Sequence, residues 1–362
     1  MLSAPGGVFI DSARLDLSRY AASPALAKAL AGYFLYVDGD AKRALELCAL
    51  ATVAAAFGDW FWKGLLGRAY AMLGLIRDAE QQLASALRLA PWNVTLRLLA
   101  GRCALRADQP STALRIYEGG MRAARGAAAN AASEGDVSLL LAAARVQETL
   151  GNSNAAVALW RRALTADATS AEATACLAAQ AFYSDQPEVA LRHYRRLLLA
   201  SGGGADAPVQ LWVNIGLSTY YAGQFDLALP CLERALVSAD SDVELADVWY
   251  NIGCVAVGTG DVALASQAWT IAIAADATHA EARTNLGVLE ARKGNFAAAR
   301  AHYASAQRAA DWLYEPFYNG ALLAWRAGDV AAANVQILRA LALFPAHTDS
   351  QELSAMISKS LK

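Results

Sequence analysis

Small residues recur at a period of 34 residues along this 362-residue chain, and this repetition constrains the fold more than any other feature. When Trp60 is numbered as position 1, alanine occupies position 20 of all nine periods. These alanines are Ala44, Ala79, Ala113, Ala156, Ala190, Ala228, Ala265, Ala299 and Ala333. Position 8 is always glycine or alanine, whereas position 24 is bulky in eight periods. Small residues facing large ones at a fixed interval predict identical helical units that interdigitate.

The residues between these positions indicate where each helix ends. Position 15 is glycine in seven periods, which suits the left-handed residue that terminates a first helix. The other two periods carry Asp-Gln-Pro there, at 108–110 and 185–187, and each proline can start a second helix. Together these positions resemble the signature of the tetratricopeptide repeat, a helix pair of 34 residues.

The predicted fold class is all-α, a right-handed tetratricopeptide-repeat superhelix (α-solenoid) of about nine helix pairs plus a C-terminal capping helix. Residues 1–24 form a lead segment, and residues 25–347 form the nine repeats. The repeats start near residues 25, 60, 94, 137, 171, 209, 246, 280 and 314. Residues 348–362 are the expected cap, since Leu353, Ile357 and Leu361 follow helical spacing. Surplus residues around Ala123–Gly135 are expected to lengthen a second helix and add a loop.

Composition and motifs argue against several classes of function. The net charge is −2 without a basic stripe, so nucleic acid is not an expected partner. The sequence contains no run of about 18 apolar residues, so direct membrane insertion is not expected. The four histidines lie in different repeats without an acidic or cysteine neighbour at metal-binding spacing. We therefore expect no catalytic residue, no metal site and no cofactor, and a protein that is not an enzyme.

The first helix of each pair is expected to line a groove that holds a partner chain. Position 9 of three successive repeats is arginine, position 6 of the last four is asparagine, and Phe61 also falls on a groove position. These candidate groove residues are Arg68, Arg102, Arg145, Asn214, Asn251, Asn285, Asn319 and Phe61. Asparagine amides can bind an extended backbone, and arginines favour carboxylates.

Two further features of the groove follow from the same positions. Position 2 of the late repeats is acidic (Glu172, Asp247, Glu281 and Glu315), which predicts basic residues in the partner. Part of the aromatic cluster Trp60–Trp62 is expected to be exposed to a partner. Two alternatives stay open, in which the asparagines tie adjacent helices together and the arginines are ordinary solvated charges.

Several stretches match more than the repeat requires. They are Phe182–Leu198, Ala246–Asp261, Phe9–Tyr20, Asp59–Lys63 and His279–Ala282. In solvent-side and turn residues they closely resemble the Bardet–Biedl syndrome 8 family, the tetratricopeptide subunits of the BBSome, and the resemblance runs from about Leu2 to about Leu353. Members of this family usually carry an N-terminal extension, with another helical pair and a Pro/Arg/Thr-rich tract, which this sequence is expected to lack.

That resemblance implies a non-catalytic scaffold subunit of a coat-like cargo adaptor, which moves membrane proteins in and out of cilia with intraflagellar transport. The implied partners are the family's small extended subunit, held in the groove, the second tetratricopeptide subunit and subunits with β-propeller domains. An Arf-like GTPase would recruit the complex to membranes. The implied localisation is the cytoplasm, the ciliary base (basal body) and, through the complex, the ciliary membrane surface.

Two other functions are weighed against this one. A peptide-binding tetratricopeptide co-chaperone needs lysine at set first-helix positions, which this sequence lacks. The targeting module of a glycosyltransferase also lines a superhelix with asparagines, but no catalytic domain is present in these 362 residues.

Overall fold

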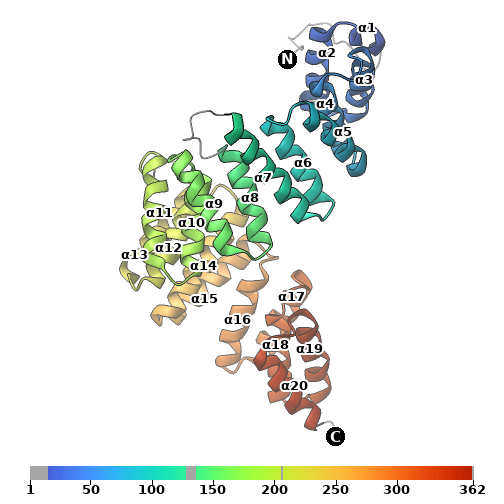
Figure 1. Ribbon diagram of the computed structural model, residues 1–362. Coiled ribbons are helices and arrows are strands. Elements are labelled where there is room, and N and C mark those ends of the chain that lie inside the picture. Colours follow the sequence, from blue (N-terminus) through green and yellow to red (C-terminus); the bar gives the residue numbers. More distant parts are fainter. Residues whose placement is uncertain (1–14, 128–135, 205–206, 361–362) are drawn as a thin grey trace, which may run out of the picture. The chain divides into compact units, whose positions relative to one another are not determined.

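The computed structural model describes residues 15–127, 136–204 and 207–360, and all regular secondary structure in these ranges is helical (Figure 1). Much of the predicted lead segment, including the first residues of the stretch Phe9–Tyr20, lies outside the described residues. So do residues 128–135 of the predicted insertion. The chain divides into two compact units, Met1–Leu177 and Ala178–Lys362.

The first unit is built from short antiparallel helices. They are α1 (Leu17–Ala21), α2 (Pro24–Tyr33), the π-helix η2 (Phe34–Asp38), α3 (Ala41–Ala54), α4 (Trp60–Met72), α5 (Ile76–Leu89), α6 (Val94–Arg106), α7 (Pro110–Ala127), α8 (Val137–Thr149) and α9 (Ser153–Ala166). The boundary between the units falls inside α10 (Ala171–Tyr183).

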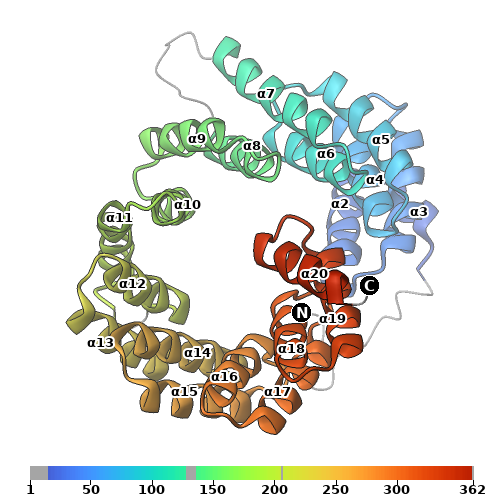
Figure 2. The same cartoon turned by 90° about the horizontal axis from the view of Figure 1, so that it is seen from below.

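The second unit continues with helix pairs of similar length. They are α11 (Pro187–Ala200), α12 (Val209–Tyr221), α13 (Phe225–Ser238), α14 (Asp242–Thr259), α15 (Val262–Ala275), α16 (Ala280–Arg292), α17 (Phe296–Ala309), α18 (Glu315–Arg326), α19 (Val330–Leu343) and α20 (Thr348–Ser360). Within this unit the first helices α12, α14 and α16 line one face, and their partners α13, α15 and α17 line the opposite face (Figure 2).

The helix ends follow from local chemistry. Asp59 caps α4 by accepting the Phe61 N–H at 2.8 Å, and Asn93 caps α6 by accepting the Leu96 N–H at 3.0 Å. All seven position-15 glycines have positive φ angles, for example +81° at Gly74. Asp108 and Asp185 adopt the same left-handed conformation, each with φ of 57°. Pro110 and Pro187 then begin α7 and α11.

Each helix pair packs through small residues against large ones. All nine position-20 alanines are fully buried. A Cβ atom on Gly101 would lie 2.2 Å from the Tyr117 ring, and one on Gly253 would lie 2.4 Å from Trp269 Nε1. Gly32 is the exception among the position-8 glycines, because no atom lies within 4 Å of its Cβ position. The small residue at position 8 therefore lets the bulky position-24 side chain fill the space between the two helices.

These observations confirm the predicted fold class, an all-α tetratricopeptide solenoid. The last helix, α20, buries Leu353 and Ile357 against α19 and its neighbours, as a capping helix should. The division into a lead segment, nine repeats and a cap stays a prediction. The helix bounds depart from it at α14, which begins at Asp242 rather than near residue 246.

Candidate partner-binding groove

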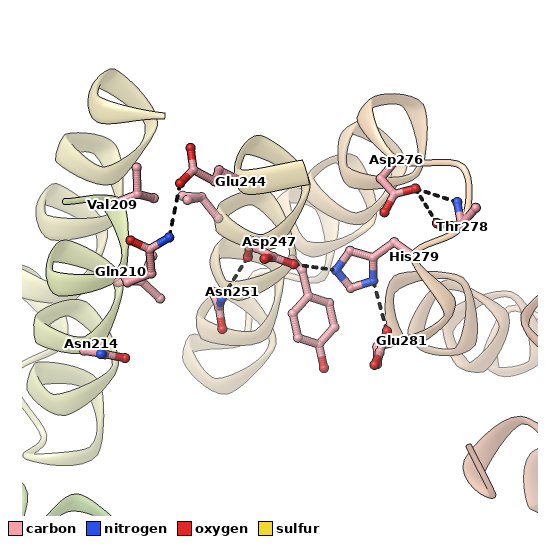
Figure 3. A pocket seen from close by; sticks show the side chains of 13 residues that line it. Val209, Gln210, Asn214, Glu244, Asp247, Asn251, Asp276, Thr278, His279 and Glu281 are labelled. Carbon is pink, nitrogen blue, oxygen red and sulfur yellow. Dashed lines mark hydrogen bonds and ion pairs between the residues drawn. The ribbon is translucent and has the colours of Figure 1, made fainter. Parts of the chain in front are cut away.

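A cavity of about 610 Å³ opens on the first-helix face of the second unit (Figure 3). Its walls come from the N-terminal halves of α12 and α14, from the turn between α15 and α16, and from the first turn of α16. We call it the acidic cavity, because four carboxylates line it. They are Glu244, Asp247, Asp276 and Glu281.

Hydrogen bonds fix two of the carboxylates in their ionised form. Glu244 accepts the Asp240 N–H and the Gln210 Nε2–H, both at 3.1 Å, and these bonds lower its pKa. Asp276 accepts the Thr278 hydroxyl at 2.7 Å and the Thr278 N–H at 2.8 Å, which lowers the pKa of Asp276. Both groups therefore carry negative charge at neutral pH.

Asp247 behaves differently from these two. Partial burial raises its pKa above the ordinary value. The negative charges of Glu281, Asp276 and Glu244 add to the rise, and His279 opposes it. Asp247 therefore stands in an environment that disfavours its negative charge.

His279 closes one side of the acidic cavity and was missed as a site residue in the sequence. Its side chain is only 8% exposed, and its Nδ1 caps α16 by accepting the Ala282 N–H at 3.3 Å. Nδ1 also lies 3.3 Å from Glu281 Oε2, and Nε2 lies 3.6 Å from Asp247 Oδ1. The ring packs on Tyr250, with 4.9 Å between ring centroids. Glu281 follows His279 closely in the sequence, but Asp247 comes from the preceding helix pair, so the sequence alone does not place it beside His279.

The structure brings two of the four predicted asparagines into the acidic cavity. Asn214, which is exposed, and Asn251 line it, whereas Asn285 and Asn319 do not. Asn251 Nδ2 donates to the Asp247 carbonyl in its own helix at 2.8 Å. Asn285 on α16 interacts with the Tyr250 side chain on α14, which fits the alternative in which asparagines tie adjacent helices.

The three predicted arginines all lie in the first unit. Arg68 stacks on the Tyr36 ring, with 4.3 Å between the guanidinium carbon and the ring centroid. Arg145 Nε donates to Glu172 Oε1 at 2.6 Å, so Glu172 has a basic partner within the chain itself. Arg102 is exposed. The arginine series is therefore three separate environments, of which only Arg102 has no such contact among the ion pairs and cation–π contacts of the described residues.

The aromatic cluster at the start of α4 is less exposed than expected. Trp62 is 3% exposed and belongs to the core of the first unit. Phe61 is half-buried against that core, and Lys28 Nζ lies 4.7 Å from its ring centroid. Because two sides of Phe61 are already in contact, a partner would find a smaller aromatic surface than the sequence suggested. The selection of groove residues as a whole stays a prediction.

Comparisons with known proteins give the family. A model of the tetratricopeptide repeat matches residues 250–312. Tetratricopeptide repeat protein 8 of Homo sapiens is 38% identical over 379 residues, which cover 98% of this chain and 68% of the human protein. The chain belongs to the tetratricopeptide repeat protein 8 family. The Mus musculus member is 41% identical over 353 residues, covering 98% of this chain and 66% of the mouse protein.

The family name expected from the sequence is corrected accordingly. The relatives are named tetratricopeptide repeat protein 8, where we had expected the name Bardet–Biedl syndrome 8. Tetratricopeptide repeat protein 8 is the product of the Bardet–Biedl syndrome 8 gene, so the correction concerns the name under which the family is stated. This chain spans about two thirds of the length of the relatives, 66% of the mouse and 68% of the human protein.

Among solved structures, the crystal structure of the APC/C hetero-tetramer Cut9–Hcn1 matches 95% of this chain and 65% of that chain. Its TM-score is 0.51 and its identity is 14%, so the similarity supports the fold alone. This fold is typical of non-catalytic protein-interaction scaffolds. In the part of the chain that the structure describes, no helix is both long and apolar enough to span a membrane. In the same ranges, no three His, Cys, Asp or Glu side chains are arranged to hold a metal ion.

Proposed function

We propose that this chain is a non-catalytic scaffold subunit of the BBSome, a coat-like adaptor that carries membrane proteins in and out of cilia with intraflagellar transport. Membership of the tetratricopeptide repeat protein 8 family, over 98% of the chain, is the observation that supports this role. The scaffold part of the proposal rests on the repeat fold, which is typical of protein-interaction surfaces.

Within that complex, the chain holds the small extended subunit along its first helices. The acidic cavity supports this step, because Asn214 and Asn251 line it together with four carboxylates, so it offers polar partners to an extended chain. The second tetratricopeptide subunit and β-propeller subunits bind other surfaces. An Arf-like GTPase recruits the assembled complex to the ciliary membrane surface from the cytoplasm and the ciliary base.

Affinity purification tests this function. A tagged copy is expressed in ciliated cells, and the proteins that co-elute are identified by mass spectrometry. A stable multisubunit complex containing β-propeller subunits and a small extended subunit is the expected result. Recovery of a chaperone or a glycosyltransferase activity in place of that complex would overturn the proposal.

The groove itself is tested by substitution of two asparagines. Asn251→Ala combined with Asn285→Ala is expected to weaken co-purification of the extended subunit while the helical circular dichroism signal is kept. Asn334→Ala, on the second helix α19, is the matched control. Unchanged binding by the folded double variant would reject the asparagine contacts and leave the alternative in which they join helices.

A further inference from the structure

We propose that the acidic cavity is a binding site for an arginine of an extended peptide, its guanidinium held among the carboxylates. The proposal rests on the proposed function, in which an extended chain lies along the first helices. It names the residue type that this part of the chain selects.

The charge of the acidic cavity favours a cation. Four carboxylates line it, and its lining residues, all of which the structure describes, include no lysine or arginine. The nearby Arg283 points its Nε and Nη2 groups at the Ala277 carbonyl, at 3.0 Å and 2.8 Å. The negative charge of the cavity is therefore left for a ligand to neutralise.

Two uncharged polar side chains that line the acidic cavity also offer acceptors to a ligand. The Gln210 amide nitrogen donates a hydrogen bond to Glu244, and the Asn251 amide nitrogen donates one to the Asp247 carbonyl. Each side chain therefore keeps its carbonyl oxygen for a ligand. A guanidinium group carries five donors and no acceptor, so it matches walls that mostly accept.

His279 belongs to the wall of the acidic cavity. Its side chain is 8% exposed, and its Nε2 is buried and faces Asp247 Oδ1 at 3.6 Å. Its Nδ1 accepts the Ala282 N–H at 3.3 Å, so both ring nitrogens face groups of the chain itself. We therefore expect the ligand to bind at the carboxylates and amide oxygens of the acidic cavity and not at the nitrogens of His279.

Shape selects arginine over lysine. The centroids of the Tyr250 and His279 rings lie 4.9 Å apart with an interplanar angle of 36°, and both residues line the acidic cavity. A planar guanidinium stacks on such a surface and still bonds carboxylates at its edge, which a lysine ammonium cannot do.

The test uses the full chain and a minimal probe, the peptide acetyl-Ala-Arg-Ala-amide, followed by ligand-observed NMR titration. The matched peptides carry citrulline, which keeps the shape without the charge, or lysine. We expect the arginine peptide to bind on the order of tenfold more tightly than the citrulline peptide, because charged hydrogen bonds are the stronger ones. The lysine peptide should fall between them.

Two double variants localise the binding. Asp247→Asn with Glu281→Gln should remove the preference for arginine. Glu188→Gln with Glu233→Gln removes the same charge from exposed residues outside the acidic cavity and should keep the preference. Equal binding of arginine and citrulline peptides, equal binding of arginine and lysine peptides, or an equal loss in both double variants would overturn the proposal.

This assay contains only the chain and the probe, so its outcome separates from that of the proposed function. If the multisubunit complex co-purifies but the folded chain shows no preference for arginine, the arginine site is wrong and the scaffold role stands. If the chain prefers arginine through Asp247 and Glu281 but no complex co-purifies, the scaffold role in the BBSome fails.

Discussion

Replacement of Gly253 by alanine tests the packing rule that builds every helix pair. The new Cβ would lie 2.4 Å from Trp269 Nε1 and 2.6 Å from Trp269 Cδ1, closer than real contacts allow. Trp269 is 4% exposed, so its indole has no free space to enter. It also donates from Nε1 to the Tyr250 carbonyl at 3.1 Å, and any shift of the ring weakens that bond.

The magnitude follows from three contributions. Overpacking in a filled core costs about 1–3 kcal/mol. Loss of the bond between Trp269 and Tyr250 costs about 0.5–1.5 kcal/mol. Alanine in place of glycine inside a helix stabilises the helix by about 0.8–1 kcal/mol. We therefore expect Gly253→Ala to lower the free energy of unfolding by about 0.5–4 kcal/mol.

Gly32→Ala is the matched control, because it makes the same change at the same position of another repeat. No atom lies within 4 Å of its Cβ position, so only the helix preference remains. This variant should be up to about 1 kcal/mol more stable than the unmodified chain. Urea unfolding followed by circular dichroism and tryptophan fluorescence measures both. Changes of the same sign in the two variants would refute the idea that position 8 is small because of the position-24 side chain.

Three further predictions concern other parts of the molecule. Asp185→Gly should stabilise the chain by up to about 1 kcal/mol, because glycine adopts the φ of 57° without strain, whereas Gly74→Ala at φ of 81° should destabilise it in urea unfolding. Burial raises the pKa of the Cys48 thiol to about 12, so iodoacetamide at pH 8 should label the half-buried Cys231 well before Cys48, as mass spectrometry would show. Leu353→Ala should cost about 2–5 kcal/mol and accelerate amide hydrogen exchange in α20, since Leu353 is 2% exposed.

Much of the fold was accessible from the sequence because its signals are local. The close approach of Gly101 to Tyr117 joins two residues of one repeat, and the same spacing recurs in other repeats. The left-handed residues Asp108 and Asp185 closely follow the helices that they terminate. Such patterns do not depend on distant parts of the chain. The period of 34 residues places the start of α14 near residue 246, whereas the helix begins at Asp242. It begins there because Ser241 caps it by accepting the Glu244 N–H at 3.3 Å. This serine followed three residues later by glutamate is a known capping pattern, and it marks the start of α14 better than the repeat period does.

The candidate site was less accessible because it depends on contacts between helix pairs. Asn214 and Asn251 share a helix position and both reach the acidic cavity. His279 lies just before its repeat in the frame, so nothing in the periodic pattern marked it as a neighbour of Asp247. The burial of Trp62 likewise depends on its packing against the preceding helices, since it shares a core cluster with Phe34 and Leu47.

Asp247 offers a last test, since a residue kept for binding can weaken the fold that carries it. Its folded pKa is raised, first by partial burial and then by neighbouring carboxylates, so the folded chain disfavours the ionised form. The stability that the protonated form contributes is present below the ordinary aspartate pKa and is lost as the pH rises through the raised value. At pH 7 the ionised side chain therefore slightly lowers the free energy of unfolding, and Asp247→Asn should be at least as stable as the unmodified chain.

The stability difference should disappear in acid, where both side chains are neutral. Urea unfolding at pH 7 and pH 3 measures this, with Glu233→Gln, an exposed residue in the middle of α13, as the control of unchanged stability. A clear loss of stability in Asp247→Asn at pH 7 would mean that the carboxylate holds the fold together through His279, and it would contradict an assignment of Asp247 to ligand binding. A gain, paired with loss of the preference for arginine, is what a carboxylate retained for a partner predicts.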